Sequence, residues 1–101
     1  MKVKYKNKVY EIYKTTYANN GTLALSIYYH KELFSVPTKN LGVTPGPEYQ
    51  YIDTNNYPWL PDFIEKTGIG EPWKFMVARS GFCTYPMYKF KIDNIEDENE
   101  G

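Results

Sequence analysis

The tripeptide Asn19-Asn20-Gly21 constrains the fold of this chain more than any other local feature. It separates two runs, residues 9–17 and 23–29, that are rich in β-branched, aromatic and aliphatic side chains. Asparagine and glycine tolerate the positive φ angles that tight hairpin turns require. The sequence therefore predicts an antiparallel hairpin formed by these two runs.

Two further strands are expected beside this hairpin. Val3 and Tyr5 alternate with lysines, which is the period of two of a strand with one buried face. Asn7-Lys8 can turn the chain into residues 9–17, and a polar turn at residues 30–32 leads into residues 33–36. The first 36 residues are therefore predicted to form an antiparallel meander of four strands.

The second half of the chain mixes breaks with one helical segment. Residues 37–47 hold three prolines and two glycines, so they are expected to form a long loop before a short strand at 49–52. Gly68 is the expected end of a short helix, and Pro86 interrupts a last strand over 82–92, which favours an edge position or a bulge. The helical stripe consists of Trp59, Leu60, Phe63 and Ile64.

These elements predict an α+β fold, a twisted antiparallel sheet of about five or six strands packed by one short helix. The predicted single domain covers residues 1–92. Residues 93–101 hold five of the twelve acidic side chains and no apolar residue after Ile95, so they are expected to be a solvated, flexible tail. The alternative is a tail that folds back over the more basic body.

The amino-acid composition argues against several classes of protein. Twelve Lys and Arg residues balance twelve Asp and Glu residues, which argues against a generic polyanion binder and against an acidic mimic of nucleic acid. The 18 % aromatic content is ample for a core. One cysteine, Cys83, forms no intrachain disulfide, and no apolar run has the length of a leader or a membrane span. A cytoplasmic protein without membrane contact is expected, in the host cytoplasm if a phage encodes it.

The sequence holds few residues that could catalyse a reaction. His30 is the one histidine and lies in a polar turn, and Cys83 has no partner thiol for a metal. Gly68-Ile69-Gly70 is followed by Glu-Pro, which is not a phosphate-binding loop of a dinucleotide fold. The acidic residues outside the tail are scattered singly. We therefore expect no enzyme activity, no catalytic residue, no metal and no cofactor.

The most suggestive segment surrounds Arg79, the one arginine. Its guanidinium beside Ser80 and Gly81 could hold an anion, while neighbouring aromatic rings stack a planar base and asparagine amides meet the base edges. The alternative is that the rings are core and that Arg79 is tied to a carboxylate. The predicted ligand-binding residues are Tyr17, Asn19, Asn20, Trp73, Arg79, Ser80, Gly81, Phe82 and Tyr85.

The lysines at positions 2, 4, 6 and 8 form a second candidate feature. If the first strand continues through Lys8, all four project from one face and could meet a phosphate-bearing partner. The alternative is that alternating lysines keep a terminal strand from pairing with other sheets. A single arginine and no net basic charge leave no strong case for nucleic acid.

Three segments of the chain form a recognisable pattern: Thr16-Tyr17-Ala18-Asn19-Asn20-Gly21, Glu71-Pro72 and Arg79-Ser80-Gly81-Phe82. In these segments the chain resembles a family of small bacterial and phage proteins of unknown function that are common on mobile elements. The resemblance covers residues 5–92 and departs from the family pattern at 43–47, Trp59 and Trp73. It implies no catalytic residue.

The resemblance implies a non-enzymatic accessory protein of a phage or other mobile element, a class that often acts in counter-defence. Our first hypothesis is that it binds and sequesters a nucleotide-derived immune signal. The alternative is a protein-binding inhibitor of a host defence effector or nuclease. A third interpretation is a domain of a larger assembly whose aromatics build the core. Free sheet edges would also allow a homo-oligomer.

Overall fold

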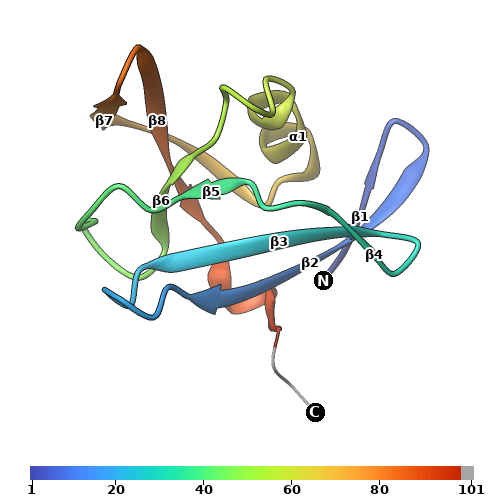
Figure 1. The fold of residues 1–101 in the computed structure, drawn as a ribbon. Coiled ribbons are helices and arrows are strands. Elements are labelled where there is room, and N and C mark those ends of the chain that lie inside the picture. The colour runs from blue at the N-terminus through green and yellow to red at the C-terminus, as the bar shows by residue number, and fades with distance from the viewer. Residues whose placement is uncertain (99–101) are drawn as a thin grey trace.

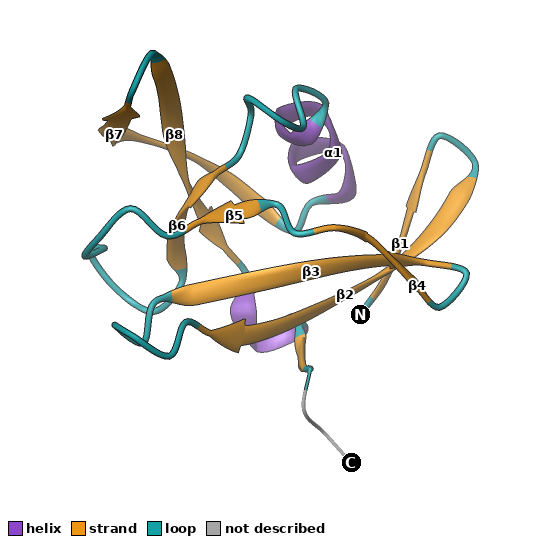
Figure 2. Ribbon diagram, viewed as in Figure 1, coloured by secondary structure: helices purple, strands orange, loops and turns teal. Residues whose placement is uncertain are grey.

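Two sheets and one short helix make up the computed structural model of the chain, which describes residues 1–98 (Figure 1). The predicted α+β class is confirmed. Figure 2 shows that strands dominate and that they divide between two sheets, where the sequence predicted one. No helix in residues 1–98 is long and apolar enough to cross a membrane.

The first sheet contains the predicted meander. Its strands run in the order β1 (Lys2–Tyr5), β2 (Lys8–Thr16), β3 (Leu23–Tyr29) and β4 (Glu32–Ser35), all antiparallel. The predicted turn between β2 and β3 is present, and Gly21 has a φ of 71° there. A short strand near the C-terminus, β9 (Glu96–Asp97), pairs in parallel with β2.

The second sheet has the order β5-β6-β8-β7. Its strands are β5 (Thr38–Lys39), β6 (Tyr49–Ile52), β7 (Gly70–Ser80) and β8 (Cys83–Phe90). β8 is a central strand, so the edge position considered for Pro86 is wrong. The bulge is present, because the register of β7 against β8 shifts between Trp73 and Val77, which lies opposite Pro86.

The helix α1 (Leu60–Thr67) lies where the apolar stripe predicts it. Leu60, Phe63 and Ile64 are buried, and α1 contacts β1 and β7. Gly68 ends the helix in the left-handed conformation, at a φ of 73°, and its N–H donates to the carbonyl of Ile64. Much later in the chain, after β8, the 3-10 turn η1 (Ile92–Asn94) leads into β9.

A main core and a smaller one support the two sheets. The main core joins the first sheet to α1 and includes Ile12, Leu25, Ile27, Ile52 and Phe63. The smaller core lies under β7 and β8, with Tyr51, Tyr85 and Met87 buried and Trp73 and Met76 packed against them.

The C-terminal segment corrects the predicted domain boundary. Ile95 is 2 % exposed and belongs to the main core, while the ammonium of Lys14 donates to the Ile95 carbonyl at 2.7 Å and lies 3.0 Å from Asp97. The prediction of a flexible tail is therefore wrong for residues 93–98, since an apolar anchor and an ion pair hold them on β2. The alternative of a folded-back segment describes residues 95–98. Residues 99–101 of that prediction lie outside the described residues.

The lysines at positions 2, 4, 6 and 8 do not form a single row. The chain turns at Lys6 and Asn7, whose φ angles are 49° and 66°. Lys8 therefore pairs with Tyr5 and shares its face, whereas Lys4 pairs with Val9 on the opposite face. The condition for a common cationic face, a strand that continues through Lys8, is not met.

Candidate functional site

The residues from Arg79 to Phe82 form the tip of the β7–β8 hairpin, an element that the sequence analysis did not predict. Ser80 pairs with Cys83, so Gly81 and Phe82 form a two-residue turn, and Gly81 supplies the positive φ of 63°. This hairpin projects from the body of the molecule (Figure 1). Phe82 is fully exposed, and Arg79, Ser80 and Gly81 are exposed as well.

Arg79 is available for an intermolecular contact. Within residues 1–98 its guanidinium makes no ion pair and no side-chain hydrogen bond, so the alternative of a carboxylate partner is not seen there. Arg79 and Val77 lie two residues apart on the same face of β7, opposite Thr84 and Pro86. The hairpin therefore presents a cation beside an exposed apolar side chain.

Two of the predicted aromatic residues support the hairpin from inside. Tyr85 is buried in the smaller core, and burial together with the Cys83 thiol raises the pKa of its hydroxyl. The Trp73 ring is half-buried, with its centroid 5.0 Å from that of Tyr49. The interpretation of these two rings as core is thus favoured over base stacking. Phe75, another aromatic residue near Arg79 in the sequence, is 83 % exposed on the bulge of β7.

Tyr17, Asn19 and Asn20 lie in a different element, the connection between β2 and β3. Each asparagine is bonded to Asn40, with the Asn20 amide donating at 2.9 Å and the Asn40 amide donating to Asn19 at 2.9 Å. The Tyr17 hydroxyl lies 3.0 Å from the Thr38 hydroxyl. These hydrogen bonds join the β2–β3 connection of the first sheet to residues 38–40 at the start of the second sheet. Tyr17, Asn19 and Asn20 therefore bond within the fold, and they do not form one site with Arg79.

An aromatic pocket between the first sheet and α1 is a feature that the sequence analysis missed. It has a volume of about 230 Å³ and is lined by residues of β1, β2, β4, α1 and the adjoining turns. No local sequence motif indicates this pocket, because its lining residues lie up to 58 positions apart in the chain. The lining residues are Tyr5, Lys6, Tyr10, Phe34, Trp59 and Phe63.

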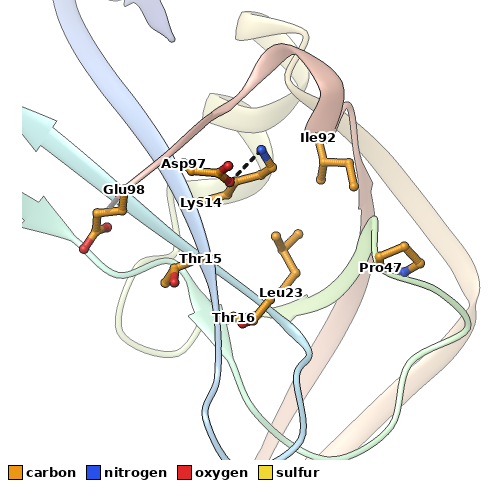
Figure 3. A pocket seen from close by; sticks show the side chains of 8 residues that line it. All are labelled: Lys14, Thr15, Thr16, Leu23, Pro47, Ile92, Asp97 and Glu98. Carbon is orange, nitrogen blue, oxygen red and sulfur yellow. Dashed lines mark ion pairs between the residues drawn. The ribbon is translucent and has the colours of Figure 1, made fainter. Parts of the chain in front are cut away.

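A larger groove of about 500 Å³ lies beside β2 and the C-terminal segment (Figure 3). Lys14 is the one cation among the described residues that line it, and Figure 3 shows its ammonium paired with Asp97. Glu98 adds a further negative charge. This groove is therefore poorly suited to an anionic ligand.

The residues weighed for catalysis are not assembled into a reactive group. His30 lies exposed in the turn between β3 and β4, and Cys83 is half-buried beside Tyr85. In the described part of the chain, no three His, Cys, Asp or Glu side chains come together as metal ligands would.

The comparisons with known proteins place the chain in a family. No curated protein and no solved structure matches it. A family model with the description "Domain of unknown function (DUF4313)" matches residues 11–100, which is most of the chain. The chain therefore belongs to the DUF4313 family.

Proposed function

We propose that the protein is a non-catalytic binding protein that holds a protein partner through the β7–β8 hairpin. The observation that carries this proposal is the fully exposed ring of Phe82 at the tip of a two-residue turn. Exposed aromatic side chains beside an arginine are typical of the residues that dominate protein interfaces. Val77 and Arg79 extend this exposed surface along β7.

The outer edge of β7 offers a second way to bind a partner, through backbone hydrogen bonds. β7 ends the order of the second sheet, so its outer backbone groups have no strand partner within residues 1–98. The bulge before Val77 divides the strand into two regular stretches, residues 70–73 and 77–80, and the second adjoins the hairpin tip. An extended segment of a partner could pair there while its side chains contact Phe82.

Sequestration of a nucleotide-derived signal at Arg79 has less support. Sites for small molecules are concave, whereas Arg79 and Phe82 lie on a projecting tip. Tyr85, proposed to stack a base, is enclosed in the smaller core. The resemblance to mobile-element proteins suggests the setting, and we propose inhibition of a host defence effector as the biological role.

Affinity capture from a bacterial host lysate tests the proposal. The wild-type protein should retain a specific partner, and Phe82→Ser should weaken that complex by about 30-fold or more, as expected for an interface anchor. Val9→Ser is the matched control, because Val9 is an exposed apolar residue of the first sheet. A partner that binds Phe82→Ser and Arg79→Ala as tightly as the wild type would contradict the assignment to the hairpin.

A further inference from the structure

Four of the aromatic side chains that line the pocket contact one another in a closed cycle. Its floor is buried, since Phe63, Tyr10 and Tyr5 are inaccessible or nearly so. Phe34 is 47 % exposed and Trp59 is half-buried, so these two rings form accessible walls. The ring centroids are 5.3 Å apart for Tyr10–Phe34, 5.6 Å for Phe34–Trp59, 5.6 Å for Trp59–Phe63 and 5.5 Å for Phe63–Tyr10.

One cation, Lys6, lines this pocket, and a second, Lys8, lies nearby on β2. The ammonium of Lys6, a lining residue, is 5.4 Å from the centroid of the Tyr5 ring. Lys8 shares the face of Tyr5, and its ammonium is 5.7 Å from the centroid of the Tyr29 ring. Within residues 1–98 neither lysine forms an ion pair.

One carboxylate lies close to the pocket, and its charge is already compensated. Asp62 accepts a 2.7 Å hydrogen bond from the Tyr5 hydroxyl and lies 3.4 Å from the ammonium of Lys66. The Lys6 charge also helps to hold the pKa of Asp62 below its ordinary value, after the larger effects of Tyr5 and Lys66. The mouth of the pocket therefore carries an excess of positive charge.

We propose that the aromatic pocket binds a planar aromatic ring that carries an anionic group, as a nucleotide does. The ring would contact Phe34 and Trp59, and the anion would lie against Lys6. Stacking on aromatic side chains tolerates any base, and a nearby ammonium selects the charged form of the ligand. The volume of about 230 Å³ is below the usual range for larger ligands, so it suits one ring system.

Free nucleotides and single-stranded nucleic acid share this chemistry. The fluorescence of Trp59 can distinguish them, and Trp73→Phe makes Trp59 the one indole of the chain. In this background we would titrate a purine nucleoside monophosphate, the matching nucleoside, inorganic phosphate and a short single-stranded oligonucleotide. The monophosphate should change the emission saturably, and the nucleoside should bind about tenfold more weakly. An oligonucleotide that binds more tightly than the monophosphate would identify the polymer as the source of the ring.

Matched variants test the two halves of the site. Lys6→Asn removes the charge while keeping a residue that tolerates the positive φ at this position, and it should weaken the monophosphate about tenfold. Lys4→Asn is the control, because Lys4 lies on the face of β1 opposite to the pocket residue Tyr5. Phe34→Ala should also weaken binding, whereas Phe82→Ala, at an exposed phenylalanine outside the pocket lining, should not.

Three results would overturn the proposal. They are an unchanged emission with all four probes, a nucleoside that binds as tightly as its monophosphate, and Lys6→Asn behaving like the wild type. Circular dichroism of each variant shows whether the fold is kept. Because Phe82 lies on the β7–β8 hairpin and outside the pocket lining, failure here leaves the proposed protein-binding function untouched, and the reverse also holds.

Discussion

The Tyr5 hydroxyl donates a 2.7 Å hydrogen bond to the Asp62 carboxylate, which joins β1 to α1. This bond, with burial, raises the pKa of Tyr5 to about 12, and it lowers the pKa of Asp62 with help from Lys66. The centroid of the Tyr5 ring also lies 4.9 Å from that of Phe63, under the aromatic pocket. One contact thus fixes the helix on the first sheet and positions the floor of the pocket.

Acid should weaken this contact. Because the pKa of Asp62 in the folded protein lies below its ordinary 3.8, the bond stabilises the fold above that value and is lost as the pH falls through the folded pKa. Tyr5→Phe lacks the bond, so its thermal midpoint should fall less steeply than that of the wild type below about pH 4. Thermal unfolding followed across this range measures the difference. Parallel curves for the two proteins would show that the bond between Tyr5 and Asp62 contributes nothing to acid sensitivity.

Alkali should act through Tyr88. Burial and the neighbouring Glu65 carboxylate, 3.1 Å from the phenol oxygen, raise the pKa of Tyr88 from 10.0 to about 12. The unfolded chain therefore ionises first, and the stabilisation present below pH 10 is lost as the pH rises toward about 12. Denaturant unfolding of Tyr88→Phe should show a smaller loss over this interval than the wild type. An equal loss would assign the effect to other tyrosines.

Gln50 connects the two sheets through a fully buried side chain. Its amide donates to the Leu23 carbonyl at 2.7 Å, and its oxygen accepts from the N–H of Tyr51 at 2.9 Å. Gln50→Leu would leave both backbone groups without their partner, so we expect a loss of about 1–3 kcal/mol in the free energy of unfolding. Chemical denaturation measures it. A loss no larger than that of an exposed substitution such as Lys74→Ala would mean that water replaces the amide.

Local patterns predicted the elements that depend on neighbouring residues. The apolar stripe and Gly68 predicted α1. Both signals, apolar residues with a period near 3.6 and a glycine that can adopt the left-handed conformation, lie within one short segment. The division into two sheets could not be predicted in this way, since it depends on contacts such as that of Gln50 with Leu23, 27 positions away. Residues 93–98 were misjudged for the same reason, because the burial of Ile95 can offset their four negative charges only once β2 is in place.

The candidate site was predicted in part. Nearness in sequence grouped Arg79 with Phe82, and a two-residue turn places both at the hairpin tip. The same reasoning included Tyr85, which the alternation of β8 directs into the core, and Asn19, whose partner Asn40 comes 21 positions later. The aromatic pocket escaped notice because separate elements supply its rings.

Ile95 should stabilise the fold as a core residue does. Its side chain is 2 % exposed in the main core, and β9 follows it along β2. Ile95→Ala is expected to lower the free energy of unfolding by about 2–5 kcal/mol, because it removes buried methyl groups and leaves a cavity. Asp93→Ala, an exposed change two residues away, should stay within about 0.5 kcal/mol of the wild type. Denaturant unfolding compares the three proteins, and equal stability of the two variants would return residues 93–98 to the status of a solvated tail.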